Sequence, residues 1–392
     1  MNTKNHFLAA RLNGKHGAVW VSVFSICLTV IFSSILLLIM RKNPLVAFYS
    51  FLQGCEFAPK ANYGGGSGML SDIFDFLNYL APMLLASLAF IIGFKAGLFN
   101  IGIAGQMLLS GFTATVLIGY QQNLPAAVAK PLVLLTGIIT GALIGALIGF
   151  LKYRFNIHEV VSTIMINYII SYLTGFMINN HYVDMITRTS RICSASSRLT
   201  WTGVPIAGVN CKVPLGIVIA VGMAVIVQFI FDKTNIGFEW KMVGSNRQCA
   251  KYIGVGVGNS IVSAMAFSGM LAGLAGVTYY LGYTNTIIPK TLVSMGYDSI
   301  SVALLGNASP LGSVFAAVIV AIFQQGANYM SSMVGVAKEI ASLITGILLL
   351  FASCGTYMKM KAAQVLQKDA DLAAQRRKPS ETALENGRGN GQ

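Results

Sequence analysis

The sequence predicts an all-α membrane protein, a polytopic helical bundle of about ten transmembrane elements with broken helices. Three observations predict it. The mean hydropathy is +0.68, and only 10% of the 392 residues are charged, whereas soluble domains carry about 25%. Apolar runs near the ~20 residues that cross a hydrocarbon core recur along the whole chain. Glycines and amides, which are poor helix formers, interrupt several of these runs.

The charge balance is strongly basic, with a formal net charge of +14 from 27 Lys and Arg residues against 13 Asp and Glu residues. In a soluble protein this excess would suggest nucleic acid as a partner. Here the basic residues lie between apolar spans, and no nucleic-acid-binding motif accompanies them. Anionic lipid headgroups and the positive-inside bias explain the excess better, so we expect a lipid bilayer around the chain and no nucleic-acid partner.

The chain begins with a polar segment, residues 1–18, that we expect in the cytoplasm. The apolar run at 19–40 is too long for the apolar part of a signal peptide and no cleavage site follows, so it is interpreted as a retained first span. A mixed loop, 41–77, is expected outside. One transmembrane domain is predicted at 19–354, and a polar tail, 355–392, is expected to be cytoplasmic and disordered.

The most informative stretch is GFKAGLFNIGIAGQ, which separates two apolar spans at 78–94 and 98–120. Inside a membrane, irregular backbone survives only where protein or a water-filled cavity satisfies its polar groups. We therefore expect this break to face a path for a polar solute. The residues of the break that we assign to the path are Gly97, Asn100, Gly102, Gly105 and Gln106.

Spans four and seven, 131–151 and 260–281, carry glycines at spacings that place them on one helix face. In lipid, a face of small residues lets another helix approach closely. We predict close-packing seams here, in preference to a hinge in span four. The glycines are Gly137, Gly141, Gly145 and Gly149 in span four and Gly269, Gly273 and Gly276 in span seven.

Span five is predicted to start near Asn156, because Glu159 three residues later fits a helix cap with its reciprocal partner. Asn167 lies within the apolar part of this span, and a buried amide must be hydrogen-bonded. It either holds helices together or lines the solute path. The sequence leaves both roles open, and Asn167 is included among the path residues.

A long polar loop at 180–214 is expected outside. It contains Cys193 and Cys211, which either form a disulfide or remain free thiols. Span six, 215–231, then leads back to the cytoplasmic side.

The internal segment at 232–259 carries four basic residues against two acidic ones. Its middle, 243–253, predicts one short helix bounded by Gly244 and Gly254. A basic, structured loop at the cytoplasmic face is what a soluble partner can grip.

Near the C-terminus, the apolar piece at 298–307 is too short to cross a membrane at 1.5 Å per residue. It is interpreted as half of a broken helix, the kind of discontinuity that transport proteins place beside their pathway. Spans at 310–330 and 338–354 follow, which gives ten elements with both termini inside.

No catalytic, metal or cofactor site is predicted. The sequence contains no GxxxxGK[ST] motif, so we expect no ATP site of its own. The four histidines are scattered, and the spans hold almost no acidic residues, whereas a proton-coupled carrier usually needs a buried carboxylate or histidine relay. We therefore expect the energy source in a partner. Uncharged amides suit a neutral, hydrogen-bonding solute, because a carboxylate would prefer a helix N-terminus or a cation.

Four stretches together carry a resemblance to a known family. They are GLFNIGIAGQMLLSG (97–111), HEVVSTIMINYI (158–169), GFEWKMVGSNRQCAKYIGV (237–255) and MGYDSISVALLGNASPLGSVFAA (295–317). In this order they resemble the best-marked regions of permease subunits of bacterial ABC importers for nucleosides, which are related to ribose-type and branched-chain amino-acid permeases.

The resemblance implies a multi-pass subunit of the cell membrane that takes up a small-molecule substrate. It implies three partners: an ABC ATPase subunit, a second homologous permease, and an external solute-binding lipoprotein. The family's motifs match this chain at the residues of the break, and at Ser162, Thr163, Asn167 and Tyr168. The family's coupling helix, which docks on the ATPase, matches 243–254, and its expected contact residues are Val243, Gly244, Arg247, Lys251, Tyr252 and Gly254.

Three rival functions remain open at this point. The first is import of sugars or branched-chain amino acids by the same architecture. The second is an ion-coupled secondary transporter that works alone. The third is a membrane-embedded enzyme, for which the sequence offers no nucleophile, metal or acid–base cluster.

Overall fold

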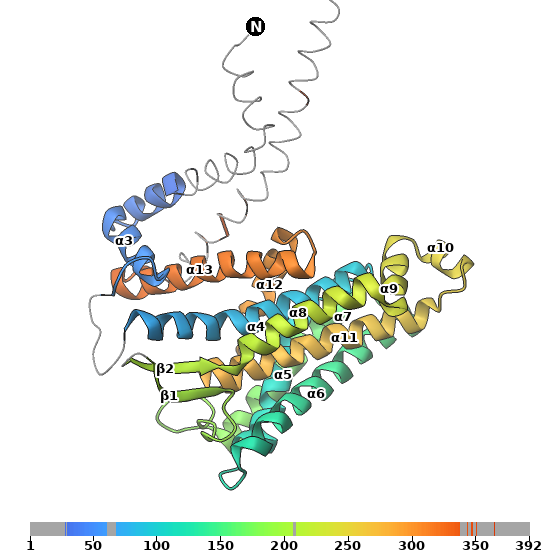
Figure 1. The fold of residues 1–392 in the computed structure, drawn as a ribbon, viewed down its shortest axis with the longest axis horizontal. Coiled ribbons are helices and arrows are strands. Elements are labelled where there is room, and N and C mark those ends of the chain that lie inside the picture. The colour runs from blue at the N-terminus through green and yellow to red at the C-terminus, as the bar shows by residue number, and fades with distance from the viewer. Residues whose placement is uncertain are drawn as a thin grey trace, which may run out of the picture. The chain divides into compact units, whose positions relative to one another are not determined.

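The computed structural model describes residues 28, 30–60, 68–206 and 209–337, and beyond these only positions 343, 346, 347, 350 and 364 (Figure 1). The chain forms two compact units, one of residues 52–326 and one of residues 1–51 with 327–392. The predicted N-terminal segment lies outside the described residues. The last span and the tail do so too, except at those isolated positions.

The larger unit is mainly helical. Its α-helices are α4 (Met69–Lys95), α5 (Ile103–Ala114), α6 (Ala126–Phe155), α7 (Glu159–Met177), α8 (Leu215–Lys233), α9 (Asn235–Ser245), α10 (Arg247–Tyr252), α11 (Val257–Thr278) and α12 (Met295–Leu305). Short π-helical segments continue three of them: η1 (Thr115–Gly119) after α5, η2 (Ile178–Tyr182) after α7 and η3 (Tyr279–Thr284) after α11. Two helices, α3 (Pro44–Gly54) and α13 (Pro310–Val334), contain residues of both units.

Within the described ranges, six helices are long and apolar enough to cross a membrane. They are α4, α6, α7 with η2, α8, α11 with η3, and α13. Shorter apolar helices lie at Val30–Ile39, Ile103–Gly119 and Met295–Leu305. A mostly helical membrane protein is therefore confirmed, while the count of about ten elements stays a prediction.

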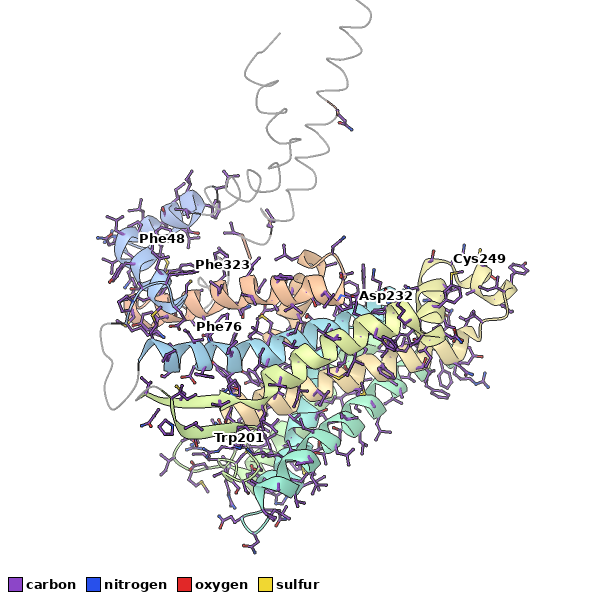
Figure 2. All side chains as sticks on the ribbon, in the orientation of Figure 1. Phe48, Phe76, Trp201, Asp232, Cys249 and Phe323 are labelled. Atoms are coloured by element: carbon purple, nitrogen blue, oxygen red, sulfur yellow. The ribbon has the colours of Figure 1, made fainter. Side chains whose placement is uncertain are left out.

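Helix α4 lies at the centre of the larger unit. Every residue from Asn78 to Gly93 is buried, as expected for a helix that is apolar on all sides. In Figure 1, α8 and α11 run alongside α4, α9 and α10 lie at one end of the unit, and the strands lie at the other end. The same separation is visible in Figure 2, where Cys249 and Trp201 mark opposite ends.

The predicted seams on spans four and seven are confirmed, because they pack against each other. A Cβ on Gly141 would overlap the carbonyl oxygen of Gly269 and lie 2.8 Å from Cα of Gly273. Gly145 is equally close to the backbone of Met265. Backbone contact at this distance is possible only for glycine, so α6 and α11 form one tightly packed pair. Gly276 belongs to a different contact, with the backbone of Met107 in α5.

The predicted cap of span five is wrong. Helix α6 continues past the expected end to Phe155, and Asn156 ends it in a left-handed conformation with φ of 52°. Helix α7 is capped instead by His158, whose Nδ1 accepts a hydrogen bond from the Val160 N–H at 3.3 Å. The Glu159 carboxylate forms a salt bridge of 2.8 Å with Lys152 rather than capping the helix. Because α6 is longer than predicted, Asn156 lies at its C-terminal end. Asn156 therefore cannot cap the start of α7.

The loop at 180–214 also differs from the expectation. It contains two antiparallel strands, β1 (Thr200–Ile206) and β2 (Val209–Pro214), which pair from Thr200 with Pro214 to Ile206 with Val209. The register shifts once, between Trp201 and Val204. The fold is therefore not purely α-helical. Lys130 of α6 stands over the Trp201 ring at 4.5 Å from its centroid, a cation–π contact that joins the hairpin to the bundle.

The expected break near the C-terminus is present. Helix α12 ends at Leu305, and Asn307 and Ala308 have positive φ values of 55° and 50° before α13 begins at Pro310. Gly306 lies against the backbone of Ser313, where a Cβ would approach the Ser313 nitrogen to 2.6 Å. The short apolar piece is thus a separate helix, as the sequence predicts.

The smaller unit has its own apolar cluster. Leu37, Ala47, Ala327, Met330 and Val336 are buried together. Lys42 donates a hydrogen bond of 2.9 Å to the carbonyl oxygen of Val334.

Candidate functional site

The break between α4 and α5 is a tight turn over residues 96–102. Gly97 has a φ of +71°, a conformation that residues with a Cβ rarely adopt. The Leu98 N–H donates a hydrogen bond of 2.9 Å to the Gly93 carbonyl oxygen near the end of α4. The glycines of the motif therefore serve the turn itself.

Asn100 holds the turn from inside. Its side chain is fully buried, and its Oδ1 accepts a hydrogen bond of 2.9 Å from the Gly102 N–H. Its Nδ2 donates to Ser268 Oγ at 2.9 Å and to Gln106 Oε1 at 3.3 Å. Ser268 in turn donates to the carbonyl oxygen of Ala89 in α4 at 2.6 Å. The amide thus satisfies backbone at the start of α5 and links it to α4 and α11.

Asn167 reaches the same turn from α7. Its Oδ1 accepts a hydrogen bond of 2.9 Å from the Gly105 N–H, and its Nδ2 donates to the carbonyl oxygen of Ile101 at 3.0 Å. A Cβ on Gly105 would overlap the Asn167 amide. Gly102 is similarly close to Thr163, with a Cβ distance of 3.1 Å. The first N–H groups of α5 are therefore capped by amides from two different elements, as unpaired helix-end donors require.

The six predicted path residues are brought together by this arrangement. Asn100 and Gln106 are fully buried and Asn167 is 2% exposed. For Asn167, the hydrogen bonds support the role of holding helices together. The path role of the set stays a prediction.

Two polar atoms beside the break have no partner. Gln106 Nε2 and Ser110 Oγ lie one turn apart on α5, both residues are fully buried, and neither atom forms a hydrogen bond within the described part of the chain. Buried polar atoms are normally paired. Next to the hydrogen bonds of Asn100 and Asn167, these two atoms are therefore available to form further hydrogen bonds.

The internal segment forms two helices, so the prediction of one helix at 243–253 is wrong. Asn246 adopts an extended conformation between α9 and α10, and its Oδ1 accepts hydrogen bonds from the Gln248 and Cys249 N–H groups at 2.9 and 3.1 Å. An asparagine that caps a new helix in this way must interrupt the preceding one.

Helix α9 is fixed to the bundle along its length. Trp240 is 1% exposed and donates from its indole nitrogen to Ser263 Oγ in α11 at 3.0 Å. Lys241 donates to the carbonyl oxygen of Phe231 in α8 at 2.6 Å. At its C-terminal end, a Cβ on Gly244 would overlap the Lys95 carbonyl oxygen and lie 2.8 Å from the Gly97 nitrogen. The internal segment therefore touches the break directly, backbone to backbone.

The predicted coupling residues fall into two groups. Val243 and Gly244 lie at the end of α9, where Val243 is buried and Gly244 faces the break. Arg247, Lys251 and Tyr252 belong to α10 and are exposed, Tyr252 to 90%. Gly254 ends the segment with a φ of +86° and open space around it.

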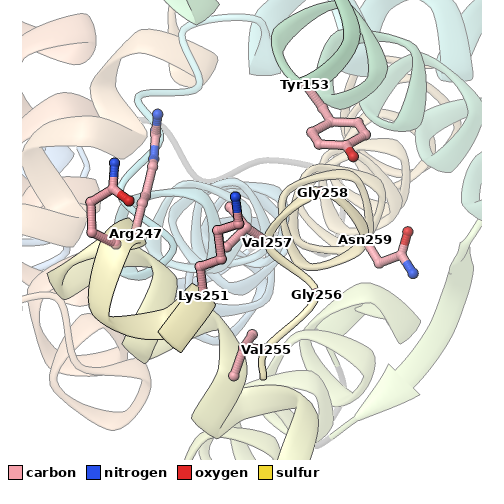
Figure 3. A pocket seen from close by; sticks show the side chains of 9 residues that line it. Tyr153, Arg247, Lys251, Val255, Gly256, Val257, Gly258 and Asn259 are labelled. Atoms are coloured by element: carbon pink, nitrogen blue, oxygen red, sulfur yellow. The ribbon is translucent and has the colours of Figure 1, made fainter. Parts of the chain in front are cut away.

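A pocket of about 540 Å³ lies beside α10. Figure 3 shows Arg247 and Lys251 on one side of it and the Tyr153 ring over Gly258 on the other. The pocket is lined by Tyr153, Arg247, Gln248, Lys251, Val255, Gly256, Val257, Gly258 and Asn259. This set contains two cationic side chains and no carboxylate, so the pocket favours an acidic group.

The opposite end of the unit holds the two cysteines of the loop at 180–214. Cys193 and Cys211 are both buried free thiols, so the disulfide is not formed. Cys193 Sγ lies 3.8 Å from Thr115 Oγ1, and burial raises the pKa of its thiol. A thiol in this setting is unreactive.

Sequence reasoning did not single out Ser268, Ser110 or Trp240. Ser268 directly precedes the seam residue Gly269, but a serine on a glycine-rich face does not by itself indicate that it receives an amide from another helix. Tyr297 was within the quoted resemblance but had no assigned role. Its hydroxyl accepts a hydrogen bond of 3.5 Å from Asn167 Nδ2.

Comparisons with known proteins agree with this architecture. Residues 72–353 match the family described as branched-chain amino acid transport system / permease component. The chain is 34% identical over 328 residues to the guanosine ABC transporter permease protein NupP of Bacillus subtilis, covering 83% of this chain and 92% of the relative. It is 30% identical over 346 residues to the nucleoside ABC transporter permease protein NupB of Lactococcus lactis, covering 87% and 92%.

A sugar permease is also similar. The glucose ABC transporter permease protein TsgB13 of Haloferax volcanii is 25% identical over 285 residues, which covers 71% of this chain and 75% of the relative. No solved structure matches the chain.

Proposed function

The chain belongs to the family of branched-chain amino acid transport system permease components, and from this premise we propose that it is the membrane-spanning permease subunit of an ABC importer for nucleosides. The observation that carries the proposal is its 30–34% identity, over most of both lengths, to permeases named for guanosine and nucleosides. The neutral amides around the break support an uncharged, hydrogen-bonding solute.

The energy source is proposed to be ATP hydrolysis in a separate ATPase subunit. Its docking surface is α10 with the pocket beside it, where Arg247 and Lys251 are exposed and can pair with carboxylates of the ATPase. The complete importer is proposed to include a second homologous permease and an external solute-binding lipoprotein.

This docking surface sets the proposed orientation in the cell membrane. The end with α9 and α10 faces the cytoplasm, together with both chain termini, and the end with the β1–β2 hairpin faces outward. The lipoprotein then delivers its solute at the hairpin end.

The contacts of α9 provide a route from the ATPase to the break. Because Gly244 touches the backbone at Lys95 and Gly97, a displacement of α9 must move the turn as well. The amide of Asn100 lies directly behind that turn. We propose that ATPase movement reaches the solute path through this contact.

The proposal is tested with the assembled importer, by measuring ATP-dependent uptake of labelled nucleosides, sugars and branched-chain amino acids. We expect nucleosides to be taken up in preference to the other classes. Preferential uptake of glucose would favour the second candidate, a sugar importer, which the similarity to the glucose permease supports. Uptake by the chain alone, driven by an ion gradient and without any ATPase, would overturn the importer assignment.

The coupling role is tested by charge reversal in the pocket. In the variant carrying both Arg247→Glu and Lys251→Glu, repulsion from ATPase carboxylates should lower uptake by about tenfold or more. Lys233→Glu is the matched control, because Lys233 is also exposed but does not line the pocket. Equal loss in both variants would contradict a specific docking role.

The path role is tested at the unpaired hydroxyl. Ser110→Ala removes a buried polar atom that has no hydrogen-bond partner, so it should not destabilise the protein. If the solute path includes this position, uptake should change while thermal stability does not. Ser87→Ala is the control, because Ser87 is buried but donates to the Leu84 carbonyl oxygen at 2.8 Å. Unchanged nucleoside uptake by Ser110→Ala would remove this part of α5 from the path.

A further inference from the structure

Three tyrosines lie exposed on two neighbouring helices of the larger unit. Tyr168 and Tyr172 of α7 are 56% and 63% exposed, and Tyr297 of α12 is 41% exposed. Tyr168 and Tyr172 are four residues apart and therefore share one face of α7. Tyr297 is linked to α7 by its hydroxyl, which accepts a hydrogen bond of 3.5 Å from Nδ2 of Asn167, the residue before Tyr168. We call these three side chains the tyrosine face.

The tyrosine face lies deep within the apolar part of the chain. In the candidate span Glu159–Tyr182, Tyr168 is about 14 Å and Tyr172 about 20 Å from the start at 1.5 Å per residue. The whole span is about 36 Å long by the same measure. In membrane proteins, tyrosines gather at the two membrane–water boundaries, because the hydroxyl needs a polar partner. Three hydroxyls at mid-span therefore indicate polar surroundings rather than lipid tails.

Another helix of the same chain shows what a lipid-facing surface looks like. Before the charged pair Asp232 and Lys233 in its last turn, the exposed side chains of α8 are all apolar: Val218, Val221, Val225, Ile226 and Phe229. By contrast, α12 continues the polar character of the tyrosine face. Ser294 and Ser301 lie three residues before and four residues after Tyr297, so they share its side of the helix. The exposed surface of α7 also carries apolar side chains, among them Met165, Ile169 and Leu173. The two surfaces therefore differ in the tyrosine hydroxyls, which the apolar stretch of α8 lacks.

The tyrosine face is connected to the break through Asn167. Its Nδ2 donates to the Tyr297 hydroxyl, and its Oδ1 accepts from the Gly105 N–H at the start of α5. Asn167 thus connects the tyrosine face by hydrogen bonds to the turn that contacts α9.

We propose that Tyr168, Tyr172 and Tyr297 form the wall of the solute path, at the face toward the second permease, and that the base of a nucleoside stacks on them during transport. The inference rests on the proposed function and names the site where the solute binds. Aromatic rings stack on any base, and their hydroxyls can hydrogen-bond a ribose or the edge of a base. Such contacts bind without strong selection among bases and also permit release, as passage through a transporter requires.

The first experiment measures nucleoside uptake by the complete importer with single leucine variants of the three tyrosines. Loss of stacking should lower uptake efficiency by about tenfold or more for each. Tyr168→Phe keeps the ring and should retain most of the activity. Phe229→Leu is the matched control for loss of an exposed aromatic ring on the apolar face of α8, and should leave uptake unchanged.

Selectivity separates a binding role from a structural one. Because purines offer a larger stacking surface than pyrimidines, Tyr168→Leu should reduce uptake of purine nucleosides more than that of pyrimidine nucleosides. An equal fall for all nucleosides, or wild-type uptake in all three leucine variants, would overturn the inference. If the unmodified importer carries no nucleoside at all, the proposed function fails instead, and the two failures are distinguishable.

A labelling experiment covers variants that assemble but do not transport. In a chain whose six native cysteines have been replaced, Tyr172→Cys should react with a water-soluble thiol reagent in the assembled importer. A saturating nucleoside should slow that reaction. A reaction rate that nucleoside does not change, or a cysteine that reacts only with lipid-soluble reagents, would overturn the proposed path.

Discussion

The seam between α6 and α11 leads to a quantitative prediction for Gly141→Ala. The new Cβ would overlap the Gly269 carbonyl oxygen and lie 2.8 Å from Cα of Gly273, about 0.6 Å short of the 3.4 Å at which ordinary contact begins. Both obstacles are backbone atoms and cannot rotate away, so the two helices must separate. Overpacking of this kind costs about 1–3 kcal/mol, which outweighs the ~1 kcal/mol that alanine gains over glycine in helix propensity.

The assay is thermal unfolding of the purified protein in detergent, followed by the fluorescence of its three tryptophans. Gly222→Ala is the matched control: Gly222 also lies inside a helix, α8, but a Cβ there would meet nothing within 4 Å. We expect Gly141→Ala to unfold at a lower temperature than wild type, and Gly222→Ala at the same or a higher temperature. Equal stability of Gly141→Ala and wild type, or equal destabilisation of both variants, would refute the packing argument.

Three further predictions concern the internal loop, the break and the external loop. Gly244→Ala pushes α9 away from the backbone of the break, so we expect uptake by the assembled importer to fall by about tenfold while ATP hydrolysis continues; wild-type uptake would contradict the linkage. Asn167→Leu leaves one N–H and one carbonyl group of the break without their partner, and each unpaired group costs about 1–3 kcal/mol of stability. The variant should therefore have a lower midpoint of chemical unfolding. An unchanged midpoint would argue against the capping role. Burial raises the pKa of Cys193, so only a small fraction of its thiol is deprotonated near pH 8. Iodoacetamide should therefore modify the exposed Cys249 first, and the rate of Cys193 modification should still rise at higher pH. Equal modification rates of the two cysteines at pH 8 would contradict this.

Much of the membrane-embedded framework could be predicted because glycine spacing and apolar runs are local signals. The four-residue spacing in span four and the glycines of span seven each predict a face for close packing, and the structure joins two of the three span-seven glycines to that face. The break at Gly97–Gly102 was equally visible. The spacing does not show which helix packs against each glycine. Gly276 therefore fits the predicted seam by its spacing, although it packs against α5.

The errors arose where one residue serves either of two neighbouring elements. Asn156 fits the start of one helix and the end of another, and the observed length of α6 decides between them. Asn246 likewise ends α9 and caps α10 within a stretch that was predicted as one helix. The hairpin at 200–214 has only a weak alternation of polar and apolar residues, so the pattern alone does not predict two strands there.

The amides of the break illustrate a limit of a different kind. An asparagine in an apolar span predicts a hydrogen bond but not its partner, and the same residue can satisfy backbone or bind solute. Asn100 and Asn167 use their acceptor oxygens on the N–H groups of Gly102 and Gly105. Their capacity for solute is correspondingly reduced. In contrast, the side chains of Tyr168 and Tyr172 are exposed, and the Tyr297 hydroxyl, which accepts from Asn167, can still donate a hydrogen bond. This contrast moves the expected solute contacts from the break to the tyrosine face.

The glycine contacts also explain how the break and the tyrosine face can respond to the internal loop. A side chain between α9 and the turn could change its conformation when α9 moves. Gly244 has no side chain, so its backbone contacts the backbone at Gly97 directly. Close-packed contacts of this kind transmit displacement rather than absorb it. Since Asn167 is bonded both to the turn and to Tyr297, a shift of α9 that moves the turn must either carry the tyrosine with it or break the partly buried 3.5 Å hydrogen bond between Asn167 and Tyr297. Asn167 Nδ2 also donates to the Ile101 carbonyl oxygen at 3.0 Å, so Asn167 moves with the turn, and Tyr297 follows as far as its longer hydrogen bond holds.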